Sequence, residues 1–116
     1  YLWGGMTQGG VDCSGFTHTV FKVNGVALHR DADLQYSHDG INVSRSIRTI
    51  DRDLLPGDLV FFRTYKPGAS HVGIYIGNRQ FIQSSPKKGI NYGDLDDLYF
   101  SERYLGAKRI LDNKVF

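Results

Sequence analysis

Apolar positions in the first quarter of the chain recur at helical spacing. Steps of three and four residues, the spacing of one helix face, join four of them: Cys13, Phe16, Val20 and Val23. Asp12 is a preferred N-cap residue, and Asn24-Gly25 favours a helix end. We therefore predict a helix from Cys13 to Val23. A shorter helix is predicted over Asp31 to His38, because acidic residues suit its N-terminus and a glycine follows it.

The pattern changes to that of strands in the second half. A turn at residues 55–58 precedes the continuous apolar run Leu59 to Phe62, which is typical of a strand buried on both faces. The segments 71–76 and 80–84 flank Gly77-Asn78 and predict a β-hairpin. A hairpin centred on Gly77 places His71 directly opposite Gln83. With a last strand from Gly106 to Leu111, the chain is expected to have an α+β fold, its N-terminal helix packed on a central antiparallel β-sheet.

Composition adds limits to this picture. The chain has 116 residues, of which 41% are hydrophobic and 22% charged, so it is long and apolar enough to bury a core as a single domain over residues 1–116. Its net charge of +2 is scattered, which argues against nucleic-acid binding. No apolar run reaches the roughly 20 residues that would span a membrane. The one cysteine cannot form an internal disulfide.

Cys13 is the first candidate for chemistry. Unpaired backbone N–H groups at a helix start stabilise an anion, so we expect the pKa of the Cys13 thiol to be lowered toward the nucleophilic thiolate. The small residues around it leave room for a substrate carbonyl. The alternative interpretation is a small buried hydrophobic residue.

His71 and Gln83 are the candidate partners of the thiol. His71 begins a strand and could act as general base, while Gln83 could accept the other imidazole N–H and orient the ring. Alternatively, both are ordinary polar residues at a strand end and on a solvent face. Two further polar residues have structural interpretations: Arg30 as partner of a core carboxylate, and Asp58 as a turn acceptor. No paired ligand spacing indicates a metal, and no cofactor is implied.

Six blocks of sequence occur in the order Tyr1-Leu2-Trp3-Gly4-Gly5, Asp12-Cys13-Ser14-Gly15-Phe16, Leu28-His29-Arg30-Asp31-Ala32 with Gln35, Pro56 to Phe62, His71 to Gly77, and Phe81-Ile82-Gln83-Ser84. Together they resemble the NlpC-type cell-wall cysteine peptidases. The resemblance implies a papain-like fold and hydrolysis of peptidoglycan stem peptides at the bond between γ-D-glutamate and a diamino acid.

The resemblance also implies roles for individual residues. Cys13 corresponds to the nucleophile and His71 to the base, while Tyr1 and the backbone of Cys13 correspond to the oxyanion hole. The third polar position, usually His in this family, is Gln83 here. We also expect four residues to line the substrate cleft: Ser14, Ser70, Ser84 and Trp3.

Asp31 follows Arg30 and precedes Ala32, as in the branch of the family that acts on free stem peptides. There the carboxylate is similar to a receptor for the α-ammonium group of the substrate, so a preference for free N-terminal L-Ala is implied. The alternative role for Asp31 is a helix cap. Members of that branch usually carry an SH3-like domain before the catalytic one, and the abrupt start at Tyr1 leads us to expect a domain from a longer protein.

Two other functions remain open from the sequence. The domain could be an endopeptidase acting on glycan-attached stems, or a catalytically weak wall-binding module on the same scaffold. The expected location is extracellular, in the cell wall or periplasm, or cytoplasmic if the enzyme recycles wall fragments. The resemblance is compatible with diaminopimelate or lysine after γ-D-glutamate, and with transfer of the acyl group to water or to an amine.

Overall fold

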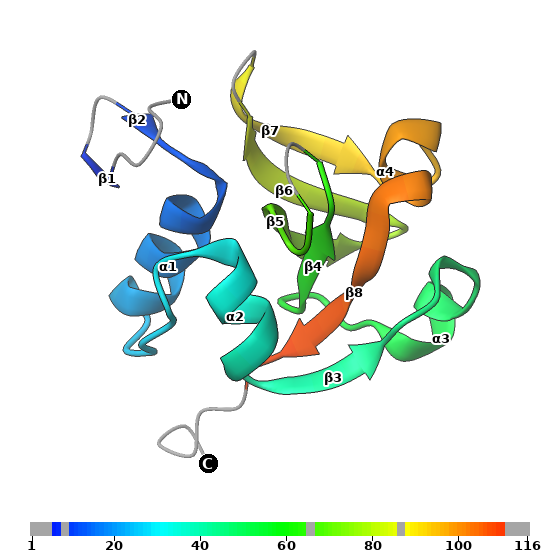
Figure 1. Ribbon diagram of the computed structural model, residues 1–116, viewed down its shortest axis with the longest axis horizontal. Helices are drawn as coiled ribbons and strands as arrows, with labels where there is room; N and C mark the ends of the chain where they lie inside the picture. The colour runs from blue at the N-terminus through cyan, green and yellow to red at the C-terminus, as the bar shows by residue number, and fades with distance from the viewer. Residues whose placement is uncertain (1–5, 8–9, 65–66, 86–87, 111–116) are drawn as a thin grey trace.

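The structure is a computed structural model that describes residues 6–7, 10–64, 67–85 and 88–110. Helix α1 (Cys13–Val23) has the predicted bounds, and its N-cap Asp12 accepts a hydrogen bond of 2.7 Å from the backbone N–H of Gly15. Helix α2 (Ala32–His38) begins one residue later than predicted because Asp31 occupies its N-cap position. Both helices lie against one side of the β-sheet (Figure 1).

Six strands in the described residues form the main sheet, in the order β3-β8-β4-β5-β6-β7, and every neighbouring pair is antiparallel. Their bounds are β3 (Ile41–Ser44), β4 (Leu59–Phe62), β5 (His71–Gly77), β6 (Gln80–Ser85), β7 (Gly89–Asp94) and β8 (Tyr104–Arg109). The last strand was predicted two residues too late, and Leu111 lies outside the described residues. Two short strands, β1 (Met6–Thr7) and β2 (Gly10–Val11), pair separately. The predicted α+β fold is confirmed.

Several elements were not predicted from the sequence. They are the edge strands β3 and β7, the 3₁₀ turn η1 (Ile47–Thr49), and the short helices α3 (Ile50–Asp53) and α4 (Leu98–Arg103). Helices α3 and α4 lie on the opposite side of the molecule from α1 and α2 (Figure 1). None of the helices in the described part of the chain is long and apolar enough to cross a membrane.

The central strand β4 is buried on both faces, as its apolar run predicted. Leu59 and Phe61 pack with Cys13, Leu28 and other residues of the α1–α2 side. The alternate residues Val60 and Phe62 pack in a second cluster that includes Ile50, Leu54, Phe81 and Leu95. The sheet therefore separates two small cores, and α1 is held against strands β5 and β6 by the first of them.

The β5–β6 hairpin forms as predicted, but its predicted register is wrong. Ile74 pairs with Ile82 and Tyr75 with Phe81, a displacement of two residues from a hairpin centred on Gly77. The turn residues are Asn78 and Arg79, both with positive φ (53° and 61°), and Gly77 pairs with Gln80 beside an irregularity in the ladder. A shift of two residues leaves every side chain on its original face, so His71 and Gln83 become diagonal neighbours.

The turn before β4 is also as predicted. The side chain of Asp58 accepts a hydrogen bond of 2.8 Å from the backbone N–H of Leu55, which confirms its role as a turn acceptor. The same buried carboxylate takes two hydrogen bonds from Arg109 at the end of β8, at 2.9 and 2.8 Å. This two-point contact ties the start of β4 to its neighbour β8.

Candidate active site

Cys13 lies in the first turn of α1, with only 4% of its surface exposed. Its Sγ lies 3.8 Å from the backbone oxygen of Ser70, and the backbone N–H of Val72 also acts on the sulfur. Ser70 and Val72 are the residues on either side of His71. The fold thus places the thiol against the backbone at the start of β5, although 57 residues separate Cys13 from Ser70 in the chain.

The pKa of the Cys13 thiol is raised, which makes the predicted lowering wrong. Burial removes water from the thiolate and is the largest cause, and the negative charge of Asp12 adds to it. The N–H groups of Val72, Ser14 and Cys13 itself act in the other direction. The helix start therefore does stabilise the anion, as the sequence argument held, but desolvation outweighs it and the resting thiol keeps its proton.

His71 and Gln83 form the predicted side-chain hydrogen bond, with His71 Nε2 2.6 Å from Gln83 Oε1. Both residues are buried. Because a carboxamide oxygen can only accept, His71 carries its proton on Nε2, and Nδ1 is the basic nitrogen of the neutral ring. Burial lowers the pKa of His71, and the bond to Gln83 partly opposes that shift. The ring is therefore neutral near pH 7, the form that a general base requires.

Asn91, which the sequence analysis did not single out, extends this chain of hydrogen bonds. It lies directly opposite Gln83 in the β6–β7 pair, and its Oδ1 accepts a bond of 3.2 Å from Gln83 Nε2. Its own Nδ2 donates to the backbone oxygen of Gly89 at 2.7 Å and to Ser85 Oγ at 2.9 Å. Its place beside Gln83 depends on the pairing of β6 with β7, and the apolar residues of β7 are exposed, so no buried apolar face marks this strand in the sequence.

Arg30 is the partner of a buried carboxylate, as predicted, and that carboxylate is Asp12. The guanidinium lies 3.0 Å from Asp12 Oδ1, and its other nitrogen donates to Ser14 Oγ at 3.0 Å. Asp12 and Ser14 flank Cys13, so Arg30 fixes the backbone on both sides of the thiol. Its positive charge also offsets the charge of Asp12 near the sulfur.

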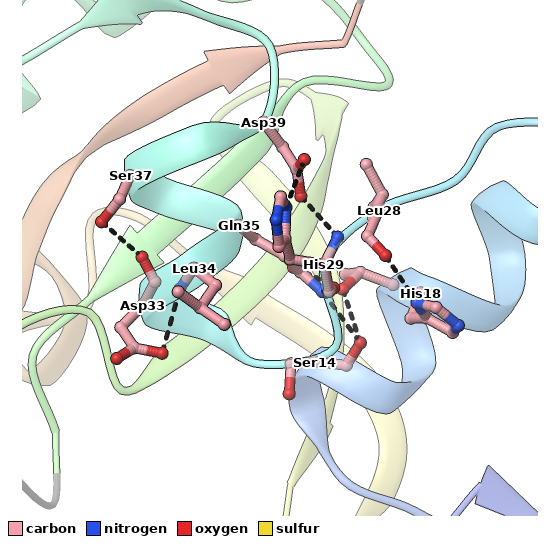
Figure 2. Close-up of polar contacts among 10 residues, drawn as sticks. Ser14, His18, Leu28, His29, Asp33, Leu34, Gln35, Ser37 and Asp39 are labelled. Carbon is pink, nitrogen blue, oxygen red and sulfur yellow. Dashed lines mark hydrogen bonds and ion pairs between the residues drawn. The ribbon is translucent and has the colours of Figure 1, made fainter.

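Gln35 holds α2 against the same turn of α1. It is fully buried, and its Nε2 donates to the backbone oxygens of Ser14 (3.2 Å) and His29 (2.7 Å), while its Oε1 accepts from Thr17 Oγ1 (2.9 Å). Figure 2 shows Gln35 reaching from α2 toward Ser14 and His29. The first turn of α1 is thus positioned by α2 as well as by the sheet.

The remaining predicted site residues are placed as follows. Asp31 is exposed at the N-cap position of α2, and its side chain makes no capping hydrogen bond. Ser14, Ser70 and Ser84 are buried; Ser70 Oγ accepts a bond of 2.8 Å from the N–H of Thr64. A role for these hydroxyls in substrate binding stays a prediction. Tyr1 and Trp3 lie outside the described residues. Within the part that the structure describes, no group of three or more His, Cys, Asp or Glu is placed to hold a metal ion.

Comparison with known proteins decides the family. The sequence profile of the NlpC/P60 family matches residues 1–109, nearly the whole chain. The chain belongs to the NlpC/P60 family. This NlpC/P60 chain is 43% identical over 113 residues to the probable endopeptidase NlpC of Escherichia coli K12, and 44% identical over 110 residues to the probable peptidoglycan endopeptidase LytE of Bacillus subtilis 168.

A solved structure agrees with the fold. The crystal structure of an NlpC/P60 family protein from Bacillus cereus superposes with a TM-score of 0.83 at 36% identity, over 97% of this chain and 35% of that one. The papain-like α+β fold is thereby confirmed. The NlpC/P60 chain described here corresponds to part of its relatives: the matches cover 95% of it but 68% of NlpC, and 94% of it but 30% of LytE.

Proposed function

We propose that this domain is a cysteine peptidase that hydrolyses peptidoglycan stem peptides. The observation that carries the proposal is the 2.6 Å bond from His71 to Gln83 at the start of β5, where the thiol of Cys13 also lies. A nucleophile, a base and a group that orients the base are the parts that thiol acyl transfer requires. The names of the relatives NlpC and LytE, both endopeptidases and one of them a peptidoglycan endopeptidase, support the same conclusion.

The reaction follows from the protonation states of the two residues. His71 Nδ1 takes the proton from the Cys13 thiol as Sγ attacks the amide carbon, and the oxyanion forms near the backbone N–H of Cys13. The tetrahedral intermediate collapses, the C–N bond breaks, and His71 returns the proton to the leaving amine. Water, deprotonated by His71, then attacks the thioester carbon, the C–S bond breaks, and His71 returns the proton to Sγ as the acid is released. Burial favours this route because it disfavours a charged pair before substrate arrives.

The bond we propose is that between γ-D-glutamate and a diamino acid, with a preference for a free N-terminal L-Ala. Asp31 supports the preference because it sits beside Arg30, which binds the residues on both sides of Cys13, and because its carboxylate is exposed without capping α2. A carboxylate in that position could bind an α-ammonium group. The proposed location is the cell envelope or the extracellular space, with an SH3-like domain upstream.

A second candidate is an endopeptidase that cleaves glycan-attached stems, in which the N-terminal L-Ala is acylated. The names of the relatives favour it, since NlpC and MepS of Escherichia coli K12 and LytE of Bacillus subtilis are all named endopeptidases. The two candidates share the same chemistry at Cys13 and differ only in what the cleft accepts at the amino end of the stem.

The test uses defined stem tripeptides, L-Ala–γ-D-Glu–diamino acid, with a free or an N-acetylated terminus and with either lysine or diaminopimelate at the third position. We expect products cut after γ-D-Glu by mass spectrometry, kcat/KM about tenfold or more higher for the free peptide, and no turnover by Cys13→Ala. Asp31→Asn should remove most of the preference through KM, while Asp33→Asn, an exposed carboxylate in the same helix, should not.

Each outcome separates the candidates. No cleavage of either peptide, or turnover retained in Cys13→Ala, would overturn the peptidase proposal. Equal cleavage of the two peptides, unchanged in Asp31→Asn, would instead assign the enzyme to glycan-attached stems and leave Asp31 with a structural role at the start of α2.

A further inference from the structure

A row of four hydrogen-bonded groups begins at the His71 imidazole and ends at a backbone carbonyl at the start of β7. The chain runs from His71 Nε2 to the amide of Gln83, from Gln83 to the amide of Asn91, and from Asn91 to the backbone oxygen of Gly89. Each amide has one end that donates and one that accepts, so each link could in principle run either way.

Only the last link cannot be reversed, and it sets the direction of the others. A backbone carbonyl such as that of Gly89 only accepts, so Asn91 must turn Nδ2 toward it and Oδ1 toward Gln83. Gln83 must then donate with Nε2 and turn Oε1 toward His71. His71 must therefore hold its proton on Nε2. The direction of the whole chain of hydrogen bonds is fixed by the carbonyl of Gly89, three hydrogen bonds away from His71.

We propose that Asn91 is a positioning residue that keeps His71 in the tautomer able to accept the Cys13 proton. The inference rests on the proposed cysteine peptidase function, in which Nδ1 of His71 is the base. If the Gln83 amide turned over, its Nε2–H would face His71 Nε2, and the ring proton would move to Nδ1. That tautomer has no lone pair to offer the thiol on the Nδ1 side.

Burial makes Asn91 necessary to this arrangement. Gln83 is 5% exposed and His71 8% exposed, so water cannot compensate for an amide turned the wrong way. With Asn91 in place, a turned Gln83 would set two amide oxygens against each other. Without the Asn91 amide, both orientations of Gln83 still bond His71, and among the described residues no other side-chain bond to Gln83 selects one of them.

The experiment reads the tautomer directly, by two-dimensional ¹⁵N–¹H correlation of the imidazole in the whole chain at pH 8. We expect the Nε2–H form in wild type, a mixture of both tautomers in Asn91→Ala, and a fall of about tenfold in kcat at unchanged KM. Asn42→Ala, which removes an exposed asparagine from the other edge strand β3, is the matched control and should change neither.

A second pair of variants isolates the orientation of the amide. Gln83→Glu has two oxygens at its end, so it accepts from His71 Nε2 whichever way it turns. In that background Asn91→Ala should leave the Nε2–H tautomer intact. Asn91→Asp, which keeps an acceptor for Gln83 Nε2, should also retain that tautomer in the otherwise wild-type chain.

The outcomes are separable from those of the proposed function. A pure Nε2–H signal in Asn91→Ala would overturn the proposal, whatever happens to activity, and a loss of kcat with that signal would make Asn91 merely structural. A mixed signal in a chain that cleaves no stem peptide would uphold the tautomer control and overturn the peptidase assignment instead. Should Asn91→Ala not fold, Asn91→Ser gives the same readout, because a hydroxyl can donate or accept and so sets no direction.

Discussion

Opposing influences act on Cys13, and their balance determines how the thiol would react. The N–H groups around the sulfur stabilise the thiolate, whereas burial and the neighbouring carboxylate of Asp12 destabilise it. Arg30 offsets part of the Asp12 charge from 3.0 Å. The result is a neutral thiol at the start of α1 and a neutral imidazole at the start of β5, so in the proposed reaction proton transfer and attack on substrate are expected to occur together.

The charge of Asp12 can be removed without removing the helix cap, because Asn caps a helix about as well as Asp. Asp12→Asn leaves Arg30 unopposed near the sulfur, so the pKa of Cys13 should fall. We expect the rate of alkylation of Cys13 by iodoacetamide at pH 7.5 to rise about threefold or more, in proportion to the thiolate fraction. In wild type the rate should increase only above the pKa of about 8.5 of a free cysteine.

Arg30→Gln is the opposing variant for the same measurement. It leaves the Asp12 charge without its partner, so the pKa of Cys13 should rise further and alkylation at pH 7.5 should slow. Equal rates in both variants and wild type would show that the Asp12–Arg30 pair acts only on the backbone. Faster alkylation in Arg30→Gln would mean that local unfolding, rather than charge, controls access to the thiol.

At the level of elements, the sequence predicted those whose signal is local and long. Helix α1 carries an N-cap, an apolar face and a terminator, and strand β4 an apolar run after a turn. Helices α3 and α4 have only four and six residues, too few for a periodic pattern. The edge strands β3 and β7 are largely exposed, so their side chains carry little of the alternation that reveals a strand.

The register of the hairpin depended on contacts that lie outside it. Arg79 occupies a left-handed turn position, where arginine is uncommon, and its guanidinium lies 2.6 Å from Asp96 and 3.2 Å from Asp51. A local pattern centred on Gly77 could not include these distant partners. The error did not disturb the site, because a two-residue shift preserves the face of each side chain.

The contact between Phe81 and Gly93 leads to a prediction about the stability of the β6–β7 pair. Its ring lies over Gly93, its partner in the ladder, and a Cβ at Gly93 would overlap the ring. Because Phe81 is fully buried, it cannot move aside, and Gly93→Ala should lower the free energy of unfolding by about 1–3 kcal/mol in urea denaturation. The added methyl group should cost less in a Phe81→Leu background, where the ring is absent. Equal losses in both backgrounds would exclude overlap as the cause.

For the whole molecule, the sheet order brings together segments that are far apart in the chain. The start of α1 meets the start of β5, and β5 places His71 near Gln83 of β6. Sequence motifs were enough to select Cys13, His71 and Gln83 as candidates and to predict the hydrogen bond between His71 and Gln83. They could not reveal Asn91, which depends on the pairing of β6 with β7, or the balance of burial and charge that raises the pKa of Cys13.

The buried side chains of His71 and Cys13 also predict how the stability of the molecule depends on pH. The pKa of His71 is lowered in the folded chain, so below about pH 6.5 the unfolded chain binds a proton that the folded chain does not bind. The free energy of unfolding therefore falls as the pH decreases. The pKa of Cys13 is raised, so above about pH 8.5 the unfolded chain loses a proton that the folded chain keeps, and stability falls as the pH increases. Each limb can reach a slope of about 1.4 kcal/mol per pH unit for one proton.

Urea unfolding followed from pH 5 to pH 10 should therefore give a plateau between about pH 6.5 and 8.5, with a decline on each side. Cys13→Ala should flatten the alkaline limb up to about pH 10, where the half-buried Tyr104, whose pKa is raised to about 12, begins to lower stability as well. His71→Gln should flatten the acidic limb and leave the alkaline one. If each variant lowers stability equally at every pH, the pKa values of the thiol and the imidazole are the same in the folded and unfolded chains, and burial holds neither group neutral.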